Sequence, residues 1–243
     1  MSDQSTSKPS REKPESRLTV KQVLRFLIVV LLMPAVLFIA AGRLNWVMGW
    51  VYSGVVLALT VVSRIAMLRA APELLVERAR FDEAEDAKSW DRPLVPLVAI
   101  YLPLVGLIIA GLDDRLGWSP ELPLWLQIVA LILVALGTLI GTWAMVVNRF
   151  FSAVVRIQKD RGHTVVTDGP YRFVRHPAYL GALVTAFASA VALDSLWTLI
   201  PAGLTALLYI VRTALEDKTL CEELPGYAEY AQQTRYRLLP GVW

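Results

Sequence analysis

The sequence predicts an all-α, polytopic membrane protein with about six transmembrane helices. Hydrophobic residues make up 56% of its 243 positions, and the mean hydropathy is +0.51. The charged residues gather in blocks and leave uncharged runs at 26–42, 44–63, 93–112, 122–148, 177–193 and 195–211. A spanning helix needs about 20 apolar residues, so the first four runs qualify comfortably and the last two form a short hairpin. The runs lack the alternation of strands, and helices satisfy their own backbone polar groups in lipid.

The basic residues predict the orientation of these helices. All 24 lysines and arginines except Arg43 and Arg115 lie before the first run, after the second, after the fourth or after the sixth. Because cytoplasmic loops carry an excess of Lys and Arg, this pattern predicts six spans with both termini in the cytoplasm. We expect the plasma (inner) membrane as location. The net charge of +3 then reflects topology and attraction to anionic lipid, and nucleic acid is not expected as a partner.

The first half of the chain reads as a tail followed by two helical hairpins. Residues 1–17 are rich in Ser, Lys, Glu and Pro, a composition typical of a disordered basic N-terminal tail. Residues 18–147 are predicted to form a four-helix transmembrane region, with turns around 43–45 and 113–115. The apolar run after the tail resembles a signal peptide, but the five runs that follow favour an uncleaved span. Residues 72–91 indicate either an amphipathic surface helix or a solvated loop.

Small residues predict close packing of the fourth helix. Gly137 and Gly141 are four positions apart, with Thr138 and Thr142 beside them. Such spacing allows two helices to approach closely in a bilayer.

Residues 148–243 differ in character and are expected to hold a ligand at the cytoplasmic boundary. A polar loop precedes His176 and Pro177, which would start the fifth helix, since proline suits a first helical turn. The free N–H groups of that turn favour an electron-rich ligand. Tyr171 and Tyr179 can stack on a ring, although interfacial tyrosines and arginines also anchor helices to headgroups.

A second group of residues lies at helical spacing just past the sixth run, at Arg212, Glu216, Asp217 and Leu220. Arg212 and Glu216 share a helix face, so they form either an ordinary ion pair or part of a pocket. Charge at that depth is costly unless it serves a site, which favours the pocket. The tail is expected to fold back over this pocket with Tyr227, Tyr230, Tyr236 and Arg237. The single cysteine, Cys221, excludes an internal disulfide and any multi-cysteine metal site, and no metal is expected.

Five short motifs of this region occur in an order that resembles a known family. They are His-Thr-Val-Val-Thr-Asp-Gly-Pro-Tyr at 163–171, Arg-His-Pro-Ala-Tyr-Leu-Gly at 175–181, the group from Arg212 to Leu220, Pro-Gly-Tyr-Ala-Glu-Tyr at 225–230 and Arg-Leu-Leu-Pro at 237–240. Together they resemble the isoprenylcysteine carboxyl methyltransferase family and, more broadly, the membrane-embedded phospholipid methyltransferases. The first three helices resemble the family only in being hydrophobic.

The resemblance implies S-adenosylmethionine as methyl donor, bound in a cytoplasmic C-terminal helical cofactor site. The cofactor-binding residues that it implies are His163, Thr164, Val165, Val166, Tyr171, His176, Pro177, Ala178, Tyr179 and Glu216. It assigns catalytic positions to Arg212, Glu216 and His176, with Arg212 orienting the carboxylate of the acceptor. Two positions depart from the family: Arg156 replaces a donor-binding glutamine, with Gln158 two residues on, and Asp217 replaces the commoner second glutamate.

The expected reaction is carboxyl O-methylation of an isoprenylcysteine-like, lipophilic or lipidated acceptor that enters from the bilayer. A terminal carboxylate, with a reference pKa of about 3.3–3.7, is already ionised and needs positioning only, which a bidentate clamp by Arg212 supplies. Phospholipid N-methylation and thiol S-methylation remain alternatives. An NADPH-dependent, sterol-type reductase and a non-enzymatic scaffold or transporter are further ones. The sequence leaves the acceptor and the oligomeric state open.

Overall fold

A computed structural model describes residues 20–72 and 87–243, with side chains from Ile28 onward except Val29. The predicted tail at 1–17 and most of segment 72–91 lie outside the described residues. The regular secondary structure of the described part is helical, and it contains no strand. Its elements are α1 (Val20–Ala41), α2 (Val47–Ala70), α4 (Asp91–Pro96), η2 (Leu97–Tyr101), α5 (Leu102–Leu116), α6 (Leu124–Val147), η3 (Lys159–Arg161), η4 (Gly169–Arg172), α7 (Pro177–Ala192), η5 (Leu196–Thr198), α8 (Leu199–Glu223) and α9 (Tyr227–Gln233).

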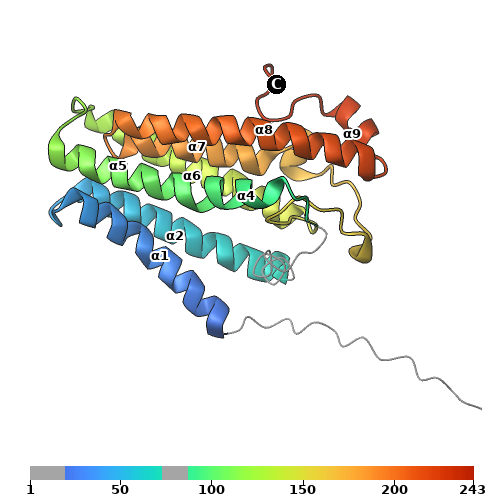
Figure 1. Ribbon diagram of the computed structural model, residues 1–243, viewed down its shortest axis with the longest axis horizontal. Coiled ribbons are helices and arrows are strands. Elements are labelled where there is room, and N and C mark those ends of the chain that lie inside the picture. The colour runs from blue at the N-terminus through green and yellow to red at the C-terminus, as the bar shows by residue number, and fades with distance from the viewer. Residues whose placement is uncertain (1–19, 73–86) are drawn as a thin grey trace, which may run out of the picture.

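The long helices form one bundle, with α4–α5, α6, α7 and α8 running alongside one another and α1 tilting away (Figure 1). Every predicted apolar run is helical. Four stretches in the described part are long and apolar enough to cross a membrane, namely Val47–Ala70, Asp91–Leu116, Leu124–Val147 and Leu196–Glu223. Two further apolar helices, Val30–Ala41 and Pro177–Ala192, are shorter. The all-helical class is confirmed, and the count of six spans stays a prediction.

One of the predicted turns is displaced. Chain reversal between α1 and α2 occurs at 42–46, as expected, but residues 113–115 lie in the last turn of α5 instead of in a turn. That helix ends at Gly117, whose φ of 64° is the left-handed conformation that glycine adopts readily at a helix C-terminus. Asp113 accepts hydrogen bonds from the backbone N–H and the hydroxyl of Ser119, at 2.7 and 2.6 Å. This contact holds the chain where it leaves the helix.

Close packing of α6 against α7 fixes the position of the site's first helix. A Cβ added to Gly137 would lie 2.6 Å from the carbonyl oxygen of Gly181, nearer than real Cβ atoms approach. The predicted role of Gly137 in close packing is therefore confirmed. Gly141 is less constrained, since its own added Cβ would meet only the Ala178 carbonyl oxygen at 3.9 Å.

The last two long helices form the predicted hairpin. The turn between them contains Asp194, a non-glycine residue with a φ of 57°, and its Oδ1 accepts a hydrogen bond of 2.7 Å from the Leu122 N–H. Helix α8 then continues without a break from the apolar run through the charged segment to Glu223. Arg212, Glu216 and Asp217 therefore belong to the same rigid helix as the sixth predicted span.

Candidate active site

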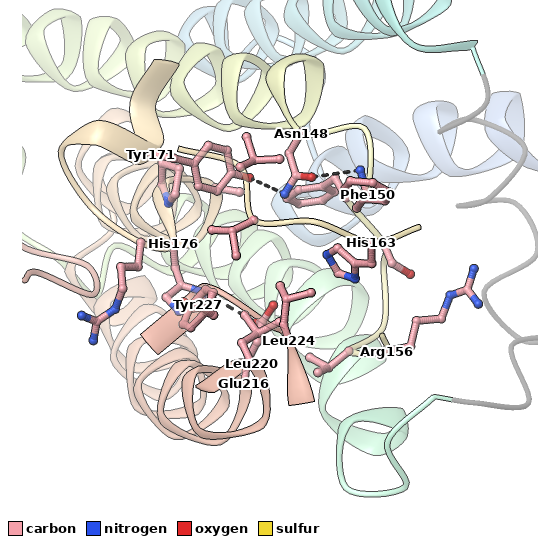
Figure 2. A pocket seen from close by; sticks show the side chains of 18 of the residues that line it. Asn148, Phe150, Arg156, His163, Tyr171, His176, Glu216, Leu220, Leu224 and Tyr227 are labelled. Carbon is pink, nitrogen blue, oxygen red and sulfur yellow. Dashed lines mark hydrogen bonds and ion pairs between the residues drawn. The ribbon is translucent and has the colours of Figure 1, made fainter. Parts of the chain in front are cut away.

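One cavity of about 100 Å³ lies where the polar loop after α6, the start of α7, the end of α8 and α9 meet (Figure 2). Every residue predicted for the site lines it: His163, Thr164, Val165, Val166, Tyr171, His176, Pro177, Ala178, Tyr179, Arg212 and Glu216. The tail residues Tyr227 and Tyr230 also line it. These named residues, which lie up to 67 positions apart in the sequence, thus line one cavity.

His176 stands at the N-terminus of α7 between two carboxylates of α8. Its Nδ1 lies 3.8 Å from Oε2 of Glu216, and its Nε2 lies 3.4 Å from Oδ1 of Asp217. Pro177 is the first residue of the helix, as predicted, because a missing N–H is tolerated there. The imidazole is 7% exposed, so it is held by these neighbours within the cavity wall.

The carboxylate of Glu216 retains a free oxygen in the cavity. Its Oε2 accepts a hydrogen bond of 2.5 Å from the Tyr179 hydroxyl. Among the described residues, none donates a hydrogen bond to Oε1 of Glu216. The Tyr179 ring stacks on His176 with centroids 5.5 Å apart and planes 9° apart. Glu216 is therefore oriented by an aromatic pair and keeps acceptor capacity for a ligand.

Asp217, the next residue, is fully engaged by protein groups. Its oxygens accept hydrogen bonds from Nε and Nη2 of Arg175 at 2.8 and 2.9 Å, from Nε of Arg237 at 2.9 Å and from the Tyr227 hydroxyl at 2.9 Å. Successive helical residues point about 100° apart, so Glu216 faces the cavity while Asp217 (3% exposed) faces this cluster. Asp217 joins α7, α8 and the tail.

The tail folds back onto the start of α7, but of its four predicted residues only Tyr227 and Tyr230 line the cavity, and Tyr236 and Arg237 do not. The carbonyl oxygens of Tyr236 and Arg237 accept hydrogen bonds from the N–H groups of Arg175 and His176, both at 2.9 Å. The backbone of the tail thus holds the two residues that directly precede α7.

Arg212 does not present its bidentate fork to the cavity. Nε donates to Oδ1 of Asp91 at 2.7 Å, and Nη2 donates to Oδ2 of Asp91 at 3.0 Å and to the Ala153 carbonyl at 2.9 Å. The expectation that this fork clamps an acceptor carboxylate is therefore wrong, and so is the alternative of an ion pair with Glu216. Nη1 donates no hydrogen bond to any described residue, so it is available to donate to a ligand.

His163 is held neutral by its surroundings in the polar loop. The backbone N–H of Gln158 donates to Nδ1 at 3.3 Å, so this nitrogen carries no proton. Burial, together with the positive charges of Arg156 and Arg161, lowers the pKa of His163 to about 4. Its ring also packs on Phe150 with centroids 4.6 Å apart.

Gln158 does not take the place of the glutamine that Arg156 replaces. Its side chain is fully buried, donating to the Phe150 carbonyl at 2.6 Å and accepting from Nη1 of Arg161 at 2.6 Å. The Gln158 side chain therefore stabilises the loop through these hydrogen bonds and does not line the cavity, whereas Arg156 does.

The tyrosines of the cavity form a connected wall. Asn148 donates to the Tyr171 hydroxyl at 3.2 Å, and the Tyr230 hydroxyl donates to the Tyr171 carbonyl at 2.7 Å. Burial raises the pKa of Tyr171 well above its ordinary value and raises the pKa of Tyr230 to about 12. Both phenols therefore stay protonated and uncharged near neutral pH.

Asn148, Phe150 and Asp91 were missed by the sequence analysis. A signal existed for Asp91, because a buried arginine such as Arg212 requires a nearby counter-charge, and Asp91 lies two positions before the apolar run that begins at residue 93. No comparable signal marked Phe150. Its contact with His163 depends on how the loop folds.

Comparison with known proteins matches residues 129–222 to the model of the isoprenylcysteine carboxyl methyltransferase family. The match covers less than half of the chain, and in these residues the chain is similar to that family. The matched region contains most of α6, all of α7 and nearly all of α8, together with the loop that lines the cavity. It excludes α9, the tail and Asp91.

The relatives divide into two kinds by name. The cobalt-zinc-cadmium resistance protein CzcN of Cupriavidus metallidurans is 30% identical over 138 residues, which cover 56% of this chain and 61% of that protein. The probable protein-S-isoprenylcysteine O-methyltransferase of Oryza sativa subsp. indica is 31% identical over 108 residues, 43% of this chain and 56% of that protein. The human protein-S-isoprenylcysteine O-methyltransferase is 37% identical over 71 residues, 28% and 25% of the two chains. The chain thus spans 61% or less of the length of each.

Proposed function

We propose that this protein transfers a methyl group from S-adenosylmethionine to the carboxylate of a lipophilic, isoprenylcysteine-like acceptor. The observation that carries the proposal is the cavity that joins His176, Tyr179 and Glu216 to the family's loop motif at the end of the apolar helices. The match of residues 129–222 to the family model and the names of the rice and human relatives support the same reaction.

The residues of the cavity suit this donor. S-adenosylmethionine, when bound, supplies a methyl group on a positively charged sulfur. A cation is favoured beside a carboxylate and over aromatic faces, and the cavity offers Glu216 with several tyrosines. We assign binding of the ribose or amino group to the free oxygen of Glu216, and binding of the remainder to His176, Tyr179 and the loop at 163–166.

The acceptor carboxylate needs positioning and no base. It is ionised near neutral pH, and Nη1 of Arg212 is the guanidinium edge left to meet it. An amine acceptor would first have to lose a proton to a base. Both ring nitrogens of His176 face carboxylates of α8, so neither is directed at an acceptor amine, as a general base would have to be. This arrangement favours a carboxylate over a phospholipid amine.

We also propose the membrane arrangement inferred from the basic residues. Six spans place both termini, and the cavity at the end of α6 and the start of α7, on the cytoplasmic side of the plasma (inner) membrane. In this arrangement residues 148–243 form the cofactor-binding region below the four-helix region at 18–147. The acceptor reaches the cavity sideways from the lipid.

Binding and turnover of purified protein in detergent test the proposal. We expect saturable binding of S-adenosylmethionine and no binding of NADPH, with binding lost in His176→Ala and Glu216→Ala. Radiolabelled methyl should pass to S-farnesylcysteine and not to its carboxamide, which has no carboxylate to methylate. Unchanged donor affinity in both variants would overturn the proposal. Labelling of phosphatidylethanolamine or a thiol instead would replace the acceptor and keep the methyl transfer.

A further inference from the structure

We propose that Asp91 is a positioning residue of this site, which fixes the Arg212 guanidinium and the cavity wall beside it. The inference deepens the proposed function and rests on it, because it concerns how the acceptor carboxylate meets Arg212. Asp91 lies outside the matched residues 129–222 and outside every motif of the sequence.

A single buried carboxylate satisfies three donors from two distant segments. Asp91 is 0% exposed. Its Oδ1 accepts from Nε of Arg212 at 2.7 Å, and its Oδ2 accepts from Nη2 of Arg212 at 3.0 Å and from the Val155 N–H at 2.7 Å. The partners lie 121 and 64 positions further along the chain. Asp91 thus joins the start of α4 to both α8 and the loop.

The same contact holds the cavity wall. Nη2 of Arg212 also donates to the Ala153 carbonyl at 2.9 Å, and the Lys88 N–H donates to the Val155 carbonyl at 2.9 Å. Val154 and Val155 line the cavity. Loss of the Asp91 carboxylate would therefore release the guanidinium and the adjoining stretch of loop together.

The Arg212 guanidinium also contacts the aromatic ring of Tyr179. Its guanidinium carbon lies 5.0 Å from the centroid of the Tyr179 ring, and the Tyr179 hydroxyl binds Glu216. Because Nε and Nη2 of Arg212 donate to Asp91, Nη1 is the guanidinium nitrogen left to bind a ligand. A planar guanidinium binds with strict geometry, so its placement by Asp91 decides where an acceptor carboxylate lies relative to the donor.

Steady-state kinetics with S-farnesylcysteine test the proposal in full-length protein. We expect Asp91→Asn to lower kcat/KM for the acceptor about tenfold or more, as removal of one partner of a buried charge pair does, with donor affinity within about twofold. Asp91→Glu, which keeps the charge, should recover part of the loss. Asp114→Asn breaks a more exposed Arg–Asp pair, with Arg43, outside the cavity lining and should leave all values unchanged. An equal loss of donor affinity in Asp91→Asn would overturn the proposal.

A double-mutant cycle separates positioning from general damage. Because Asp91 acts through Arg212, adding Asp91→Asn to Arg212→Gln should change kcat/KM by less than about twofold. The double variant leaves no unpaired buried charge from this pair, so it also tests the idea where Asp91→Asn alone fails to fold. Independent, multiplicative losses would overturn the proposal.

Chemical modification distinguishes a failure here from a failure of the proposed function. Phenylglyoxal should modify Arg212 slowly in the wild-type protein and faster by about fivefold or more in Asp91→Asn, once the fork is released. Mass spectrometry of the peptide gives the rate without any methyl transfer. Absence of turnover in the wild-type protein would reject the proposed function alone. Equal modification rates of Arg212 in the wild-type protein and in Asp91→Asn would reject the proposal that Asp91 fixes the Arg212 guanidinium.

Discussion

Tyr179 and Glu216 join the first turn of α7 to α8 through a hydrogen bond of 2.5 Å from the phenol to Oε2 of the carboxylate. The bond leaves Oε1 of Glu216 facing the cavity, and it ties the ring that stacks on His176 to the helix that carries Arg212. The motif at the start of α7 and the charged group on α8 are thus one unit.

Replacement of Glu216 by glutamine should weaken binding of S-adenosylmethionine by about tenfold or more, because a hydrogen bond to a charged group contributes about 1.5–3 kcal/mol. Tyr179→Phe keeps the carboxylate and removes only its partner, so we expect a smaller loss. Isothermal titration of the two proteins in detergent measures both. A larger loss in Tyr179→Phe than in Glu216→Gln would contradict this assignment of roles.

Asp217→Asn should destabilise the fold instead of acting on the chemistry alone. The substitution leaves the guanidinium groups of Arg175 and Arg237 without their buried counter-charge, and breaking a buried pair costs about 3–5 kcal/mol. Thermal unfolding in detergent should show a clearly lower midpoint. Glu222→Gln, in an exposed pair with Lys218, serves as the control and should change the free energy of unfolding by about 0.5 kcal/mol or less.

The titration of His163 should occur far below neutral pH. Its pKa in the folded protein is about 4, against 6.5 in the unfolded chain, so the unfolded state binds more protons between these values. The folded state therefore loses stability as the pH falls from 6.5 towards 4, and His163 contributes no pH dependence above that window. The chain has 2 histidines, so histidine-selective NMR can follow this one. The signal that disappears in His163→Gln should not shift between pH 6 and 8, and a midpoint near 6.5 would refute the neutral, buried state.

Gly137→Ala should lower stability by separating α6 from α7, because the added methyl group would lie 2.6 Å from both the Gly181 carbonyl and the Thr185 hydroxyl. Overpacking of this kind costs about 1–3 kcal/mol. Gly203→Ala in α8 is the matched control, since nothing lies within 4 Å of its added Cβ and alanine favours a helix interior by about 1 kcal/mol over glycine. Thermal unfolding of the two variants should therefore move in opposite directions. Equal midpoints would show that the contact is relaxed in the folded protein.

The elements of the fold were largely predictable because they depend on local properties. Uncharged runs of sufficient length become helices in lipid, and Asp194 marks the last hairpin correctly. The charged residues at 113–115 predict the turn after α5 too early, because they lie in the last turn of that helix. The backbone instead turns at Gly117, where the left-handed conformation is free of steric cost.

The sequence by itself determined the helical class, the boundary loop and the motif residues of the cavity, because apolar run length and short motifs are properties of neighbouring positions. Only the tertiary structure decided which charges pair. In the folded protein Arg212 pairs with Asp91, and Asp217 pairs with Arg175 and Arg237. Glu216 is left facing the cavity. Those pairs depend on which segments come within hydrogen-bond distance of one another across 20 to 121 positions of the sequence. A buried charge is stable only where packing places a partner beside it.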